Sequence, residues 1–407
     1  MINGKIQSQL LNLFWLGIII YFSAYAAIKG FPDLYVKLNL MQAIGLGIFI
    51  PASIGLIQLR VKNIFFILYL LWTGFTVFRG ISFQFSELKS SIYDADFGLL
   101  VYLVPIVMLF RIDVIFLKGL FNTIFFLGLV YIMLCIYFRS PLLMSSDDEN
   151  RTGMGLLEVF TRFLEIPCGF ILISYRYHNI GRRLFSFLIV CLALLLSLIR
   201  ARRGLIFFQS SFLICGVILS IWVNKKNLAI ILFSLFISGV VFYSFIGKIN
   251  DNNSGMFKRV SERLTEDTRS GVEQCFYDDM EVKDWIIGKG INGAYFCPGI
   301  DQGALTEYRE VIETGFLNMI LKQGLVGLVI LLFIIIPAIY KGLFLSNNLL
   351  SKAAGIWILL WLLDSYPAVV YIFSLNYIMV WLCISLCNSQ YIREMSEEEI
   401  TSMLRFR

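Results

Sequence analysis

Apolar runs long enough to cross a lipid bilayer recur along almost the whole chain. A transmembrane helix needs about 20 mainly apolar residues. Of the 407 residues, 58% are hydrophobic and 15% are charged, whereas about 25% of an ordinary soluble domain is charged. The sequence therefore predicts an all-α, polytopic integral membrane protein with about twelve transmembrane helices. The runs lie near residues 10–28, 38–59, 63–81, 97–110, 114–138, 156–177, 184–199, 204–223, 227–247, 315–340, 350–364 and 367–387.

Two of these runs allow a second interpretation. The first run ends in Ala24-Tyr25-Ala26, which imitates the cleavage site of a signal peptide. We expect it to be retained as a span, because it is long enough to cross and the sidedness below depends on it. The last two runs are separated only by Asp364-Ser365-Tyr366-Pro367, so they could instead form one broken helix.

The distribution of basic residues predicts the orientation in the membrane. Short cytoplasmic loops are enriched in Lys and Arg, and that bias appears when both termini are placed in the cytoplasm. The net charge of +6 then reflects orientation, and no nucleic-acid partner is expected. Basic residues that fall on the inner side under this assignment include Arg60, Lys62, Arg182, Arg183, Lys225 and Lys226.

The predicted spans and loops divide the chain into five parts. The only large hydrophilic segment, 248–312, falls on the outer side. We expect short amphipathic helices in it, for example within 256–267, although a merely solvated loop is the alternative. It contains Cys275 and Cys297, which are candidates for one disulfide if that compartment is oxidising. The parts are 1–149 (five spans), 150–247 (four core spans), 248–312 (the loop), 313–390 (three spans) and 391–407 (a cytoplasmic tail).

Three arginines lie together in SLIRARRG (197–204), on the outer side, where the positive-inside rule disfavours them. Arginines at a span end can simply extend to lipid headgroups. We expect instead an anion site made by Arg200, Arg202 and Arg203, because guanidinium groups offer a permanent charge and a planar fork to phosphate oxygens. Gly204 would leave room for the ligand.

Other charges lie within or beside the spans. Glu158, Arg162 and Glu165 occupy one face of the sixth predicted span, and they could hold helices together as an ion pair or line a polar cavity. We expect Arg162 to add to the anion site. Glu313 follows Arg309 where the loop re-enters the membrane, and it is either a general base or a plain acid at a helix N-terminus.

Three segments carry a resemblance to a known family. They read SLIRARRG (197–204), DWIIGKGING (284–293) and ETGFLNMILKQGLVGLVILL (313–332). In order, spacing and sidedness they resemble the superfamily of O-antigen polymerases and O-antigen ligases, and Arg151-Thr152-Gly153 is similar to that family's entry to its core. The resemblance covers roughly residues 150–390.

The resemblance implies a GT-C-like, metal-independent glycosyltransferase that uses an undecaprenyl-pyrophosphate-linked donor. It needs no cofactor, and the sole histidine, His178, falls at the opposite side of the membrane. Glu313 stands where the ligases carry their histidine, a departure that favours a polymerase over a ligase. The expected roles are catalytic for Glu313 and Arg309, pyrophosphate binding for Arg200, Arg202, Arg203 and Arg162, and substrate binding for Arg151, Glu158, Asp278, Gly288 and Gly290.

The function expected from the resemblance is polymerisation of lipid-linked oligosaccharide repeat units at the periplasmic face. The donor and the acceptor would both be undecaprenyl-pyrophosphate-linked oligosaccharides, with a flippase and a chain-length regulator as further partners. Two alternatives remain open: a ligase-type glycan transferase, and a flippase for lipid-linked oligosaccharide. The lack of a clear similarity between the two halves of the chain favours an enzyme over a transporter.

Overall fold

The computed structural model describes residues 4–58, 63–143, 151–223, 269–298 and 307–404. Almost all regular structure in these residues is helical. The helices of the first half are α1 (Gly4–Gly30), η1 (Pro32–Leu34), α2 (Tyr35–Leu56), α3 (Ile64–Gly80), α4 (Phe85–Tyr93), α5 (Leu99–Leu103), η2 (Val104–Leu109), α6 (Val114–Tyr137) and α7 (Arg139–Leu143). The next are α8 (Arg151–Phe160), the π-helix η3 (Thr161–Glu165), α9 (Cys168–Ile173), η4 (Tyr175–Tyr177), α10 (Ile180–Ile199) and α11 (Arg203–Val223).

The C-terminal part adds the only two strands among the described residues. These strands pair antiparallel, with Tyr295 opposite Arg309. The elements are α14 (Ser270–Asp279), α15 (Val282–Ile287), β1 (Tyr295–Phe296), β2 (Tyr308–Arg309), α16 (Gly315–Phe344), α17 (Leu349–Asp364), α18 (Leu375–Asn388), α19 (Gln390–Glu394) and α20 (Glu397–Leu404).

Six described helices are long and apolar enough to cross a membrane, which confirms a helical, multi-pass membrane protein. The six segments are Ile6–Gly30, Pro32–Leu56, Val114–Tyr137, Ile180–Ile199, Arg203–Ser220 and Gly315–Phe344, with shorter apolar helices at Ile64–Gly80, Leu99–Leu109 and Leu375–Asn388. The predicted run 227–247 and the predicted amphipathic helix 256–267 lie outside the described residues, so the count of twelve spans stays a prediction.

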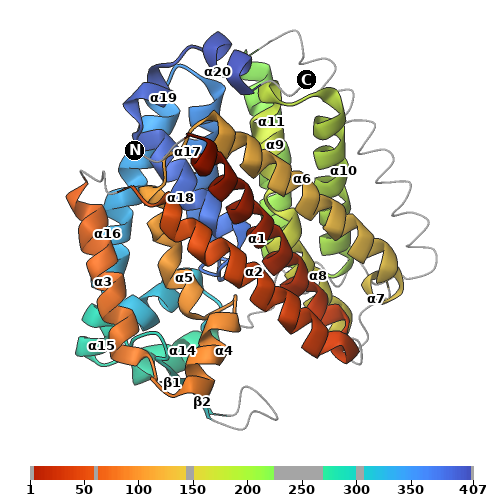
Figure 1. Cartoon of the computed structure of the whole chain (residues 1–407). Coiled ribbons are helices and arrows are strands. Elements are labelled where there is room, and N and C mark those ends of the chain that lie inside the picture. The colour runs from red at the N-terminus through yellow and green to blue at the C-terminus, as the bar shows by residue number, and fades with distance from the viewer. Residues whose placement is uncertain (1–3, 59–62, 144–150, 224–268, 299–306, 405–407) are drawn as a thin grey trace.

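The first two helices form a closely packed antiparallel pair (Figure 1). Glycines make the approach possible: a Cβ on Gly17 would lie 2.7 Å from the Phe49 amide nitrogen, and one on Gly45 would lie 2.8 Å from the Tyr21 nitrogen. Small residues at such contacts let helix backbones approach in membranes. Ile18 and Tyr21 of α1 are fully buried, so α1 is part of the core.

Two predicted spans are interrupted rather than continuous. Run 97–110 becomes α5 followed by the 3₁₀ helix η2, which contains Pro105 near its start. Run 156–177 becomes α8, η3, α9 and η4, with Pro167 between η3 and α9. Proline removes a backbone donor and breaks a regular helix. The buried Glu165 at the end of η3 accepts a 2.5 Å hydrogen bond from Gln209 of α11, so this carboxyl joins helices.

Segment 284–293, from the predicted outer loop, packs against a break in α16. Gly324 has φ 69°, a left-handed conformation inside the helix, which leaves neighbouring carbonyls without helical partners. The carbonyl of Leu321 accepts from Lys289 N (2.7 Å), that of Lys322 from Gly290 N (3.0 Å), and that of Gln323 from Trp72 Nε1 (2.8 Å). The segment 284–293 is therefore part of the helix bundle's packing.

A second break separates α17 from α18. Residues 365–374 form turns and extended chain, yet most of them are buried, including Val369, Tyr371 and Phe373. Non-helical backbone at membrane depth is tolerated where protein covers it or where it lines a cavity. The sequence allowed either two separate spans or one broken helix here. The structure has two helices, α17 and α18, and the connection between them is longer than the predicted Asp364-Ser365-Tyr366-Pro367.

The remaining short elements gather at opposite ends of the bundle. Figure 1 shows α14, α15 and the small sheet at the lower end and α19 and α20 at the upper end. At the upper end Glu397 contacts Arg176 (3.8 Å) and accepts from Leu349 N (2.7 Å). Segments assigned to the outer and inner sides by the sequence therefore lie at different ends, and which end faces the cytoplasm stays a prediction.

Candidate functional site

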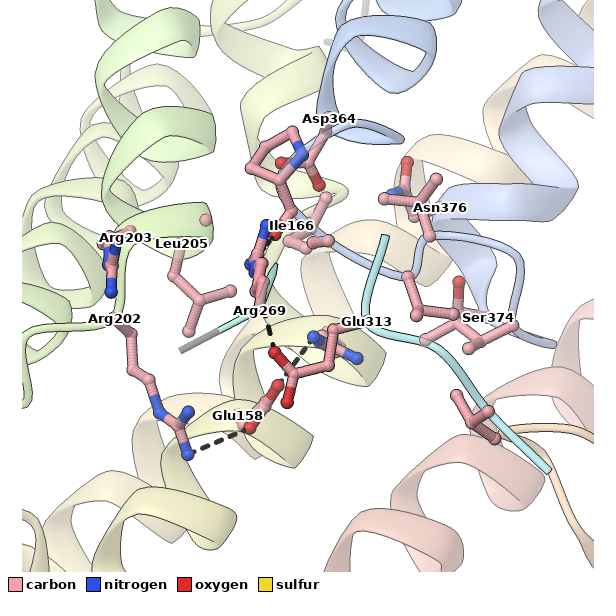
Figure 2. Close-up of a pocket in the computed structure, with 18 of the residues that line it drawn as sticks. Glu158, Ile166, Arg202, Arg203, Leu205, Arg269, Glu313, Asp364, Ser374 and Asn376 are labelled. Atoms are coloured by element: carbon pink, nitrogen blue, oxygen red, sulfur yellow. Dashed lines mark hydrogen bonds and ion pairs between the residues drawn. The ribbon is translucent and has the colours of Figure 1, made fainter. Parts of the chain in front are cut away.

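A polar cavity of about 670 Å³ lies where α8, η3, the α10–α11 turn and the α17–α18 connection meet. Figure 2 shows the labelled side chains around one common space. Its charged lining consists of four guanidinium groups and three carboxyl groups: Arg162, Arg202, Arg203, Arg269, Glu158, Glu313 and Asp364. Its apolar lining includes Phe97, Leu205, Val369 and Val370. The cavity thus combines an anion-binding side with an apolar wall.

The tight turn between α10 and α11 sends adjacent arginines in different directions. Ala201 has φ 50°, in the left-handed region that non-glycine residues seldom adopt, and Arg202 N bonds the Ser197 carbonyl at 2.9 Å. Arg202 and Arg203 line the cavity. Gly204 borders it as well, beside the α17–α18 connection, where an added Cβ would lie 3.4 Å from the Ala368 Cβ.

The structure places Arg200 away from this cavity. Its side chain is 1% exposed, and it donates hydrogen bonds to the carbonyls of Leu142 (Nε–O 3.2 Å) and Pro141. Gly153 makes room for it, because a Cβ there would lie 2.4 Å from Nη2. The predicted pyrophosphate-binding role of Arg200 is therefore replaced by a structural one, which ties the end of α10 to α7.

Glu158 lies between two of the cavity arginines. Its Oε1 is 2.6 Å from Arg162 Nη2 and its Oε2 is 3.3 Å from Arg202 Nη2. These side chains remain partly accessible, at 23–35%. The sequence left two alternatives for this helix face, an ion pair and the lining of a polar cavity. The structure contains both, because Glu158 and Arg162 form an ion pair and also line the cavity. By contrast, Glu165 is fully buried and structural.

Glu313 reaches the same cavity from the start of α16, as expected, but it is 61% exposed. Its Oε2 is 3.6 Å from Arg269 Nε, and Arg269 Nη2 donates to the Pro367 carbonyl at 2.5 Å. Arg269 therefore connects the loop end to the α17–α18 connection. The sequence did not single out Arg269, because it is one of many basic residues in the loop.

The other predicted site residues do not line the cavity. Arg309 belongs to β2, and Asp278 accepts a 2.8 Å hydrogen bond from Gln274 on the surface of α14. Gly288 and Gly290 have φ of 72° and 87° and pack against α16 and α3: a Cβ on Gly288 would lie 2.5 Å from the Lys322 carbonyl oxygen. Their role is to fit the loop onto the bundle. The side chain of Arg151 lies outside the described part of the structure.

The predicted disulfide is confirmed. Cys275 of α14 bonds Cys297 beside β1, with the Cα atoms 5.2 Å apart. Both cysteines belong to a small apolar cluster with Phe276 and Tyr295. This bond links α14 to the strand pair that precedes Glu313 in the chain.

Asp364 and Asn376 are buried polar residues of the cavity that were not predicted as site residues. Asp364 ends α17 and Asn376 lies in the first turn of α18; they are 4% and 5% exposed. The signal for Asp364 was present in the sequence, since it is an isolated acid within a long apolar stretch. No metal-binding cluster of His, Cys, Asp and Glu occurs among the described residues.

No family model matches this chain, and no curated protein or solved structure matches it either.

Proposed function

We propose that this protein is a glycosyltransferase that polymerises lipid-linked oligosaccharide repeat units at the periplasmic face of a bacterial inner membrane. The observation that carries the proposal is the convergence of Arg162, Arg202, Arg203 and Arg269 on one cavity. These residues come from three separate parts of the described chain, so the fold brings distant segments together to form the cluster. The resemblance to O-antigen polymerases supports the same function.

The arginine cluster suits departure of a diphosphate. Glycosyl transfer from a polyprenyl pyrophosphate leaves negative charge on the phosphate oxygens, and fixed guanidinium groups stabilise that charge without a metal. Glu158 forms ion pairs with Arg162 and Arg202, and Glu313 forms one with Arg269. A bound diphosphate would compete for them with hydrogen bonds of the same kind.

The size and the walls of the cavity also fit such a substrate. Ligand sites commonly enclose about 300–1,000 Å³, and this one encloses about 670 Å³. The apolar side chains Phe97, Leu205, Val369 and Val370 line the same space as the charged groups. An amphiphilic substrate, with a sugar diphosphate on an isoprenoid chain, needs both kinds of wall.

Gene replacement in the source bacterium tests the proposal. Arg202→Ala together with Arg203→Ala should abolish long surface polysaccharide while single repeat units still reach the surface. Lys283→Ala is the matched control, because Lys283 is an exposed cation of α15 that does not line the cavity, and it should leave chain length unchanged. Full-length polymer in the double variant would contradict the proposal.

A flippase for lipid-linked oligosaccharide is a second candidate, and one observation favours it. Transporters often carry discontinuous helices at their binding sites, and α16 is broken at Gly324 while residues 365–374 interrupt α17 and α18. The same variants discriminate: lipid-linked units that accumulate on the cytoplasmic leaflet would indicate transport. Polymer that is made but stays on its carrier would indicate a ligase.

A further inference from the structure

The carboxyl group of Asp364 is buried at the end of a largely apolar helix. It ends α17, is 4% exposed and lines the cavity. Its Oδ1 is buried and has no hydrogen-bond partner among the described residues, and within that part of the chain the side chain forms no ion pair. Figure 2 shows Asp364 above Arg269 in this view of the cavity.

This placement opposes stability in two ways. A helix C-terminus carries partial negative charge, which disfavours a carboxylate. A buried carboxyl oxygen without a donor also loses the hydrogen bonds that water supplied. Packing alone would be served better by an apolar side chain, so the group is best explained by a donor that the described protein itself does not provide.

Asn376 places a second unfilled acceptor in the same cavity. Its Oδ1 is also buried without a partner among the described residues, and it follows Ser374, whose Oγ caps α18 by accepting from Tyr377 N at 3.3 Å. Asp364 and Asn376 thus stand at the two ends of the extended connection 365–374. Two open acceptors beside a cavity are suited to hydroxyl donors such as those of a sugar.

Glu313 is less suited to receive a proton from a substrate. It is 61% exposed, and its carboxylate already faces the Arg269 guanidinium at 3.6 Å. Glu158 is engaged by two guanidiniums. Of the three carboxyl groups on the cavity, Asp364 alone forms no ion pair with another residue of the described chain.

We propose that Asp364 is the general base of the transfer, with Asn376 orienting the attacking hydroxyl. This inference rests on the proposed glycosyltransferase function. The acceptor hydroxyl oxygen bonds the anomeric carbon, and its proton passes to an Asp364 carboxylate oxygen. The bond between the anomeric carbon and the diphosphate oxygen breaks, and its electron pair leaves with the diphosphate on the arginine side.

The test separates chemistry from binding. Asp364→Asn keeps the size and removes the proton acceptor, and Asp364→Glu keeps the acceptor. Glu281→Gln is the control, because Glu281 is an exposed carboxylate just before α15 that does not line the cavity. Each variant is made in the full chain and scored for the chain length of surface polysaccharide, and the purified protein is titrated with undecaprenyl pyrophosphate. General bases contribute about 100-fold or more, so Asp364→Asn should leave single repeat units only.

We expect Asp364→Asn to bind undecaprenyl pyrophosphate like the wild type, Asp364→Glu to restore part of the polymer, and Glu281→Gln to make long chains. Normal polymer from Asp364→Asn would overturn the inference. So would lost binding in Asp364→Asn, since the group would then be structural. If the Arg202→Ala, Arg203→Ala protein still binds undecaprenyl pyrophosphate fully, the proposed function itself fails, which is a different result.

Discussion

Neighbouring arginines in SLIRARRG have different roles, which only the turn geometry reveals. Arg202 and Arg203 line the cavity, whereas Arg200 bonds the carbonyls of Pro141 and Leu142. Of the residues singled out from the sequence, five line one cavity: Glu158, Arg162, Arg202, Arg203 and Glu313. Charges beside apolar runs tend to gather where polar groups can be shared. The left-handed turn at Ala201, which separates Arg200 from the others, leaves no such pattern.

Arg200→Ala should therefore reduce stability. Removing the Arg200 guanidinium leaves two carbonyls without their donor, at a cost of about 1–3 kcal/mol. Thermal unfolding of the purified variants in detergent measures this. Equal melting temperatures for Arg200→Ala and the wild type would contradict the structural role.

Asp96 predicts a pH dependence of stability. It lies in the turn between α4 and α5, where its Oδ2 accepts a 2.8 Å hydrogen bond from Tyr25 Oη. Burial raises its pKa above the ordinary value of 3.8, against smaller opposing effects of the Tyr25 hydrogen bond and of Arg162 and Lys29. Because the folded protein favours the protonated form, this group lowers stability as pH rises above about 4.

Asp96→Asn should then unfold at a higher temperature than the wild type at pH 7. The advantage should shrink as pH falls toward 4, where the unfolded-state carboxyl is also protonated. Melting curves at both pH values check the sign. An advantage that grows toward low pH would contradict the argument.

Among the elements, uninterrupted apolar runs were predictable and breaks were not. Runs 114–138 and 204–223 correspond closely to α6 and α11, because a membrane leaves a long apolar stretch no alternative to a helix. The break at Gly324 was not predicted, since a glycine within an apolar run is also compatible with a continuous helix. Its cause is tertiary: segment 284–293 supplies the donors that the helix gives up.

Gly324→Ala should destabilise the protein. The residue has φ 69°, and a Cβ would lie 2.2 Å from the Ile286 carbonyl oxygen, so strain of about 1–3 kcal/mol or more is expected. Gly47→Ala in α2 is the control, because nothing lies within 4 Å of that position in the described structure. Alanine there should be neutral or stabilising by up to about 1 kcal/mol. Equal unfolding temperatures for both variants would contradict the account of the break.

For the molecule as a whole, the sequence predicted the helical membrane class and the grouping of outer segments, but not how the cavity is closed. Arg269 and Asp364 come from a loop end and from a helix end more than 90 residues apart by sequence number, and no local pattern joins them. Both residues line the cavity because Arg269 bonds the Pro367 carbonyl in the connection 365–374 that follows Asp364. The conformation of that connection depends on tertiary packing.

The disulfide offers a test of sidedness at this scale. If the end that carries α14 and α15 is periplasmic, Cys275 and Cys297 should be bonded in cells and resist alkylation until a reductant is added. The 22-residue separation predicts that the Cys275→Ser, Cys297→Ser protein loses about 3 kcal/mol. Free, alkylated thiols at both positions in freshly isolated cells would instead place this end in the cytoplasm.

The central claim is that the cavity arginines hold the diphosphate of a polyprenyl-linked substrate. An experimental structure of the protein with undecaprenyl pyrophosphate measures this most directly. We predict phosphate oxygens within hydrogen-bond distance of Arg202 and Arg203 and of at least one of Arg162 and Arg269. Phosphate density outside this cavity, with Glu158 still bound to Arg162 and Arg202, would contradict the account.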